Sequence, residues 1–185
     1  MHPALFYLPG EKLSLAELCA ARIDGHVVEL GEGYTPADTV EGPAARARGI
    51  AALVPAGTAV MGPSAAWIHG AGDAPPARHH IQRAVPHRLR VGAEPRVVYH
   101  DMLLPEPDQV TVGPLVVSDA TRTLCDLARM SPGAPDFAWW AHRLAETQPH
   151  VVAPAARLLA SAGRVPGKVR GLALLAELAA MTSPS

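Results

Sequence analysis

The sequence predicts an α+β protein with a reduced winged-helix segment, then a small mixed sheet, then a helical carboxyl third. Three observations lead to this fold class. Near the start of the chain, a capped helical pattern is followed by two short β-patterned runs. The middle of the chain holds runs of β-branched residues that are bounded by Pro and Gly and separated by turn-length spacers. In the last third, leucines recur at intervals of three and four residues, which is the spacing of amphipathic helices.

The first predicted element is a helix over residues 13–23. Ser14 is followed three residues later by Glu17, which is the spacing of a capping box, in which each side chain binds the backbone of the other residue. A turn then leads into two short strands, 27–30 and 31–34, which are joined by glycine-rich sequence. Helix, turn and hairpin in this order are the layout of a winged helix.

The middle of the chain is expected to alternate between short helices and strands. An alanine-rich helix is expected over 41–54, and a short buried strand follows it over 58–61. Ser64 precedes a helical run as an N-cap would, and Gly70 ends that run. The β-branched runs that come next are expected to form the sheet, and they cover residues 79–85, 96–100, 109–112 and 115–117.

The carboxyl third is expected to be entirely helical. Ser118 is interpreted as the cap of a helix that continues to Met130. Asp136 is interpreted as the cap of a helix over 137–144, whose apolar spacing buries one face. Two further helices are expected, over 151–162 and 168–181.

The length and composition fit a globular protein of two units. A chain of 185 residues with 49% hydrophobic residues is long enough to bury a core. We divide it into a reduced winged-helix-like domain over 1–42 and an α/β module with a helical tail over 43–185. No apolar run approaches the roughly 18 residues of a membrane span, and the start of the chain lacks the features of a secretory signal. The sequence therefore predicts a cytoplasmic protein without a membrane partner.

The near-neutral net charge conceals an uneven distribution of charge along the chain. Residues 1–43 carry seven acidic and two basic side chains, whereas residues 44–104 carry seven arginines and three acids. An acidic segment repels phosphate, and an arginine-rich one attracts nucleic acid or an acidic protein face. Five arginines around the predicted strands are candidates for a nucleic-acid or partner-binding face, with a solvated surface as the alternative: Arg78, Arg83, Arg88, Arg90 and Arg96.

The side chains that could carry chemistry are expected to be structural. The sequence contains none of the short motifs of hydrolases, zinc proteases or nucleotide-binding loops, so no catalytic residue and no cofactor are assigned. The adjacent His79 and His80 face opposite sides of a strand, and no other histidine has ligand spacing, so no metal site is expected. Arg122 and Asp126 are four residues apart on one helix and are expected to form a structural ion pair.

Two short motifs about fifty residues apart are the most informative part of the chain. The first, Pro-Ser-Ala-Ala-Trp-Ile-His-Gly, covers 63–70 and contains Ser64 and His69, and the second, Ser-Asp-Ala-Thr-Arg-Thr-Leu-Cys-Asp-Leu-Ala-Arg, covers 118–129. Because Ser64 and His69 are five residues apart, a helix does not align them as nucleophile and base, and both are expected to be structural. A third short motif, Leu-Gly-Glu-Gly-Tyr, occupies 30–34 in the predicted hairpin.

In this order, the three motifs resemble those of AbiEi-family antitoxins, which belong to type IV toxin–antitoxin and phage-defence systems. The resemblance covers most of the chain and implies a winged helix followed by an AbiEi C-terminal module, here without a nuclease extension. It implies a non-enzymatic antitoxin that restrains a nucleotidyltransferase-like toxin or acts on its target, and that regulates transcription by binding operator DNA. The acidic first segment departs from the family, so weak DNA binding is expected there. A stand-alone transcription regulator or a non-enzymatic interaction module is the alternative.

Overall fold

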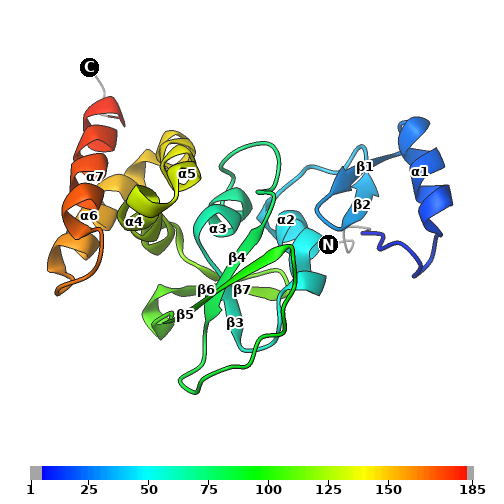
Figure 1. The fold of residues 1–185 in the computed structure, drawn as a ribbon. Helices are drawn as coiled ribbons and strands as arrows, with labels where there is room; N and C mark the ends of the chain where they lie inside the picture. Colours follow the sequence, from blue (N-terminus) through cyan, green and yellow to red (C-terminus); the bar gives the residue numbers. More distant parts are fainter. Residues whose placement is uncertain (1–5, 183–185) are drawn as a thin grey trace.

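The protein has three parts arranged in a row, namely a small hairpin unit, a five-stranded sheet and a group of helices (Figure 1). The computed structural model describes residues 6–182, so residues 1–3, which bear on the predicted location, lie outside the described part. The fold is α+β, as the sequence predicts. None of the described helices is both long enough and apolar enough to cross a membrane.

The hairpin unit consists of α1 (Leu15–Ile23), β1 (Val27–Leu30) and β2 (Gly33–Pro36). The predicted capping box is confirmed, because the Ser14 backbone N–H donates to Glu17 Oε2 at 2.8 Å and Ser14 Oγ accepts from the Glu17 backbone N–H at 3.3 Å. The two strands pair antiparallel, as predicted. A small apolar cluster holds the helix against the hairpin, and its buried members are Leu18, Val27 and Tyr34.

The central sheet is mixed, as predicted, and its strands lie in the order β5-β4-β3-β7-β6. The central strand β3 runs antiparallel to β4 and parallel to β7. At one edge β5 runs parallel to β4, and at the other β6 and β7 form an antiparallel hairpin. The strands are β3 (Thr58–Val60), β4 (His79–Arg83), β5 (Val97–Leu103), β6 (Gln109–Val112) and β7 (Leu115–Ser118).

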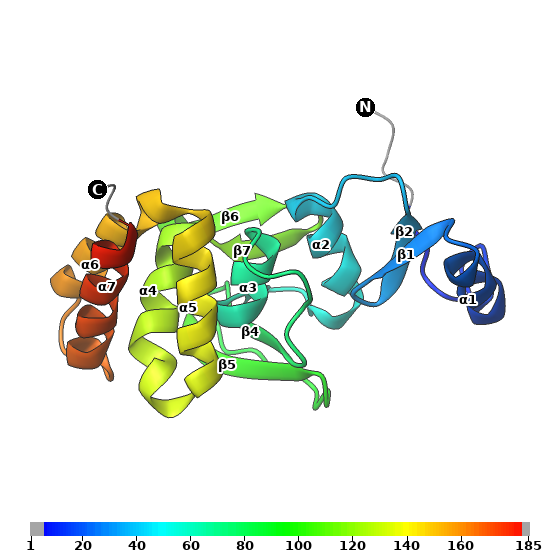
Figure 2. The ribbon, with the colours of Figure 1, turned by 90° about the horizontal axis from the view of Figure 1, so that it is seen from above.

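Helices lie beside the sheet and form the end of the molecule opposite the hairpin unit (Figure 1). Figure 2 shows α2 between the hairpin unit and the sheet, α3, α4 and α5 next to one another, and α6 and α7 at the far end. Short 3-10 turns cover Ala51–Leu53, Glu106–Asp108, Ser131–Gly133 and Pro149–Val151. The helices are α2 (Pro43–Ile50), α3 (Gly62–Ile68), α4 (Ala120–Met130), α5 (Pro135–Thr147), α6 (Val152–Ser161) and α7 (Lys168–Thr182).

Two of the predicted serine caps are wrong. Helix α3 starts at Gly62 with Met61 as its N-cap, because Pro63 fits the first turn of a helix, so Ser64 lies inside the helix. Ser118 is the last residue of β7, and the N-cap of α4 is Asp119, whose carboxylate accepts the backbone N–H of Arg122 at 2.8 Å. In the first case the helix begins before the serine, and in the second the strand continues through the serine, so the next residue takes the cap position.

The starts of α2 and α5 also differ from the sequence prediction. Helix α5 begins at Pro135 with Ala134 as N-cap, so Asp136 lies in the first turn, where its charge favours the positive end of the helix dipole. Helix α2 begins at Pro43 and tightens into a 3-10 turn after Ile50, because Pro55 cannot extend it. The remaining predicted helices occur with ends shifted by a few residues.

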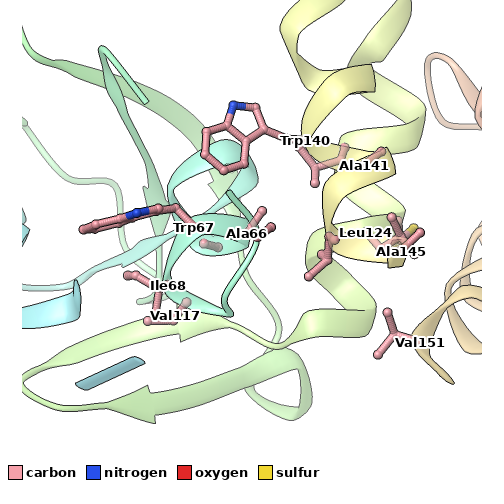
Figure 3. Close-up of a cluster of buried hydrophobic side chains, with 14 of the residues drawn as sticks. Ala66, Trp67, Ile68, Val117, Leu124, Trp140, Ala141, Ala145 and Val151 are labelled. Carbon is pink, nitrogen blue, oxygen red and sulfur yellow. The ribbon is translucent and has the colours of Figure 1, made fainter. Parts of the chain in front are cut away.

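One continuous apolar core connects the sheet to the helices. Figure 3 shows Trp67 and Ile68 of α3 beside Val117 of β7, facing Leu124 of α4 and Trp140 of α5. The core relies on alanines, whose small side chains let α3, α4 and α5 approach closely, as aromatic residues make up only 4% of the chain. The buried alanines among the labelled side chains are Ala66, Ala141 and Ala145.

Candidate functional site

The two motifs that stand out in the sequence meet in the structure. His69, near the end of α3, places its Nε2 atom 2.7 Å from the carbonyl oxygen of Ser118, at the residue before the α4 cap. Ser64 Oγ accepts the backbone N–H of His80 at 3.0 Å and lies 3.3 Å from Nδ1 of His79. Both residues therefore join α3 to neighbouring strands, although the cap role predicted for Ser64 is wrong.

Arg122 and Asp126 form the predicted ion pair, and the structure extends it into a chain of four charges. Arg122 Nε lies 2.8 Å from Asp126 Oδ2, and Arg122 Nη1 lies 2.7 Å from Asp108 Oδ2. The other oxygen of Asp126 accepts Arg129 Nε at 2.7 Å. Asp126 is only 1% exposed, so both of its oxygens are satisfied by arginines rather than by water. The sequence did not predict the ion pair of Asp108 with Arg122, because Asp108 precedes β6 and lies outside the motif.

Two of the five candidate arginines form ion pairs of 3.4 Å or shorter within the chain. Arg96 Nη1 lies 2.6 Å from Glu32 in the turn of the amino-terminal hairpin. Arg83 Nε lies 3.4 Å from Asp101, and the side chain of Arg83 is 16% exposed. The acidic first segment therefore neutralises part of the basic middle, and the five arginines do not line one free sheet face.

The other three candidate arginines face solvent. Arg88 and Arg90 lie in the loop between β4 and β5, and the side chain of Arg88 is 88% exposed and forms a long ion pair of 4.0 Å with Asp101. Arg78 precedes β4 and lies 3.4 Å from the carbonyl of Val97. We call Arg78, Arg88 and Arg90 the exposed arginine group. This group is the part of the predicted binding face that remains available to a partner.

The turn of the amino-terminal hairpin is packed against α2. Gly31 has a φ of 62°, and a Cβ there would collide with the carbonyl of Gly49. The backbone N–H of Glu32 donates to that carbonyl at 2.6 Å, and the Glu32 carboxylate pairs with Arg96. In a winged helix this hairpin is the wing. Its turn is held by the rest of the protein and presents a carboxylate that is already paired.

We expect the full-length protein to bind duplex DNA weakly at physiological salt. The hairpin unit is acidic and its turn is occupied, so phosphate attraction has to come from exposed arginines elsewhere, among them the exposed arginine group. In a gel-shift titration, any residual binding should fall further in the variant Arg88→Ala/Arg90→Ala and should not change in Glu11→Gln. Tight binding that survives the loss of both arginines would contradict this expectation.

A pocket of about 490 Å³ lies between the sheet and the start of α5. His80 of β4 and His100 of β5 line it, with Nδ1 of His80 3.0 Å from Nε2 of His100. The ring of Phe137 packs edge-on against His80 at a centroid distance of 5.0 Å. The sequence analysis missed this pair, because only the parallel register of β4 and β5 brings the two histidines together.

The histidines of β4 and β5 are held in the neutral form. Burial lowers the pKa of His79 to about 4, with the nearby Arg96 cation acting in the same direction. Burial also lowers the pKa of His80 to about 4, and His100, Arg78 and His79 contribute to the shift. The pKa of His100 is lowered by burial too, although Asp126 opposes the shift. At neutral pH these imidazoles are therefore uncharged hydrogen-bonding groups.

Comparison with known proteins identifies no family. No model of a known family matches the chain, and no curated protein matches its sequence. Among solved structures, the chain is similar to the RV2827C protein from Mycobacterium tuberculosis, with 21% sequence identity and a TM-score of 0.34. That similarity covers 88% of this chain and 69% of the other.

Proposed function

We propose that this chain is a cytoplasmic antitoxin-like regulatory protein that acts by contact rather than by catalysis. The observation that carries the proposal is the junction of the two motifs through His69 and Ser118. This contact supports a single folded module, because residues of both AbiEi-like motifs hold its elements together. On this proposal the partner is a nucleotidyltransferase-like toxin or the toxin's target.

The polar residues of both motifs support a scaffold role within this proposal. Ser64 and His69 bind backbone atoms of neighbouring elements, and Asp126 is saturated by two arginines. Burial raises the pKa of the Cys125 thiol to about 11, so at neutral pH it is a protonated, weakly reactive group. On this proposal, surface side chains outside the motifs bind the partner.

The exposed arginine group is the face through which we propose that the protein binds its partner. Arg78, Arg88 and Arg90 extend from the sheet's β4–β5 side into solvent. Arginine presents several N–H donors in a planar fork, which suits an acidic or hydrogen-bond-rich protein surface. The same chemistry suits phosphate, so an operator-binding regulator is the second candidate, and the gel-shift titration separates the two.

Co-expression with a neighbouring nucleotidyltransferase-like gene product is expected to relieve its growth arrest. Simultaneous replacement of Arg78, Arg88 and Arg90 by Ala should reduce the relief, because it removes the cations that face the partner. The measurement is colony number and growth rate after induction of the toxin.

A matched triple variant keeps this test specific. Replacing the exposed Arg157, Arg164 and Arg170 by Ala removes the same charge from α6, α7 and the segment between them, beyond the sheet, and should leave the relief unchanged. Relief that persists in a folded exposed-group variant would exclude this face. Failure of the parent chain to relieve arrest would count against the antitoxin function and favour the regulator.

A further inference from the structure

We propose that the protein associates with copies of itself head to tail, through a hollow at the start of α7 that receives the end of α1 from a second copy. The hollow has a volume of about 480 Å³. Apolar and cationic side chains line it together, and they are Pro132, Val165 and Val169 with Arg164, Lys168 and Arg170. We call this surface the α7 hollow.

The α7 hollow is held in shape by close packing of three helices. Gly167 has a φ of 77°, and a Cβ there would collide with the backbone carbonyl of Arg129 in α4. Lys168 Nζ donates to the carbonyl oxygen of Ala160 at 2.8 Å and to that of Ala162, so it ties the start of α7 to the end of α6. The hollow therefore exists without a partner and needs no rearrangement to receive one.

The charge around the α7 hollow is not neutralised within the chain. Residues 151–185 contain four cations, and Glu177 is their only acid. Arg164 and Arg170 are exposed, and neither forms an ion pair within residues 6–182. Val169 lies between Lys168 and Arg170 and is 83% exposed. The hollow thus suits an apolar side chain that has a carboxylate beside it.

The other end of the same molecule presents this combination. Ile23 is the last residue of α1 and is 82% exposed, and the next residue, Asp24, is exposed and has no ion pair in the described part of the chain. We call Ile23 and Asp24 the α1 tip. The surrounding segment, residues 1–43, carries seven acidic and two basic side chains, so its charge is opposite to that of the α7 hollow.

The positions of the two surfaces require a second copy as the occupant. Helix α1 lies at one end of the molecule, and α6 and α7 lie at the opposite end (Figures 1 and 2). The α1 tip therefore cannot reach the hollow of its own chain. A contact between two different surfaces leaves one of each kind free on every pair, so the association produces open chains unless the rotation between copies closes a ring.

Sedimentation equilibrium of the full-length protein tests the association. A small contact with exposed charges belongs to the weak interfaces, so we expect the weight-average mass to rise beyond two chains as concentration increases at low salt. It should return toward one chain in about 1 M NaCl, where the screening length is about 3 Å. A mass that stays at one chain up to about 1 mM protein, or that levels off at two chains, would overturn the proposal.

Two variants that each lose one surface give a sharper result. Ile23→Ser/Asp24→Asn removes the α1 tip and keeps the hollow, whereas Arg164→Glu/Arg170→Glu reverses the charge of the hollow and keeps the tip. All four residues are exposed, so both variants should fold like the parent by circular dichroism. Each variant alone should have the mass of one chain. An equimolar mixture has one intact hollow and one intact tip, so it should form a dimer that does not grow further. A mixture without dimer would refute the head-to-tail contact.

A matched control separates this contact from general attraction between acidic and basic segments. Val40 is 89% exposed and Asp38 is exposed, but both lie in the segment between β2 and α2 rather than at the end of the molecule. Val40→Ser/Asp38→Asn should therefore associate like the parent. If it lost association as fully as the α1 tip variant, the contact would not be specific and the proposal would be wrong. Because the test follows mass alone, its outcome is independent of the proposed antitoxin role.

Discussion

Replacing Asp126 by Ala is expected to destabilise the protein by about 3–5 kcal/mol, which is typical when one partner of a buried ion pair is removed. Asp126 is 1% exposed and binds both Arg122 and Arg129, so its loss leaves two largely buried guanidinium groups without their shared carboxylate. Arg122→Ala should destabilise less, because Asp126 keeps Arg129 as a partner. Urea unfolding followed by circular dichroism measures the free energy of unfolding for each variant.

An exposed pair provides the control for this measurement. Arg143 and Glu146 also lie on one helix, but both side chains are at least 42% exposed. Glu146→Ala should therefore change the free energy of unfolding by less than about 1 kcal/mol. If Asp126→Ala unfolded like the parent and yet lost biological activity, the charge network would be functional and the structural interpretation would be wrong.

Acidification from pH 7.5 to pH 5 is expected to lower the free energy of unfolding by about 2 kcal/mol for each of His79 and His80. Their pKa values are about 4 in the folded protein, and an unfolded histidine has a pKa of about 6.5. The unfolded chain therefore takes up protons first as pH falls. This contribution to stability is fully present above pH 6.5 and is lost progressively from there down to pH 4.

Single substitutions separate these histidines from other titrating groups. Urea unfolding at pH 7.5 and pH 5 should show a smaller pH effect in His80→Asn than in the parent, by about 2 kcal/mol. His150→Asn removes an exposed histidine and should leave the pH effect unchanged. Carboxyl groups titrate mostly below pH 5, so they contribute little over this interval. Equal pH effects in the parent and His80→Asn would show that His80 is not held neutral.

Local patterns in the sequence predicted most of the elements but not how they begin. The Ser14 and Glu17 capping box occurs as expected, since both partners lie within one turn of helix. The caps assigned to Ser64 and Ser118 failed for different reasons. Ser64 lies inside α3, and its hydroxyl accepts the backbone N–H of His80 in β4. Ser118 ends β7, and its hydroxyl binds Thr123 of α4 while the next residue, Asp119, caps that helix. The sequence alone does not show which of these positions the helix start occupies.

In the candidate site, too, contacts within one helix could be predicted from the sequence and contacts between distant segments could not. The ion pair of Arg122 and Asp126 could be predicted because helix geometry fixes the positions of residues four apart. The pairing of Arg96 with Glu32 and that of His80 with His100 depend on strand order and register. Charge counting along the chain therefore overstated the basic surface, because it could not show that the two oppositely charged segments meet.

The position of β3 at the centre of the sheet affects how the chain can fold during synthesis. Its partner on one side, β4, is the next strand in the sequence. Its partner on the other side, β7, comes only after β5 and β6. A nascent chain thus carries β3 with one edge unpaired while the ribosome adds the intervening residues. An open strand edge can pair with another chain. A polypeptide released before Leu115–Ser118 would keep that edge permanently, so a truncated product would tend to aggregate, whereas the hairpin unit at the amino end, whose strands pair locally, could already be complete.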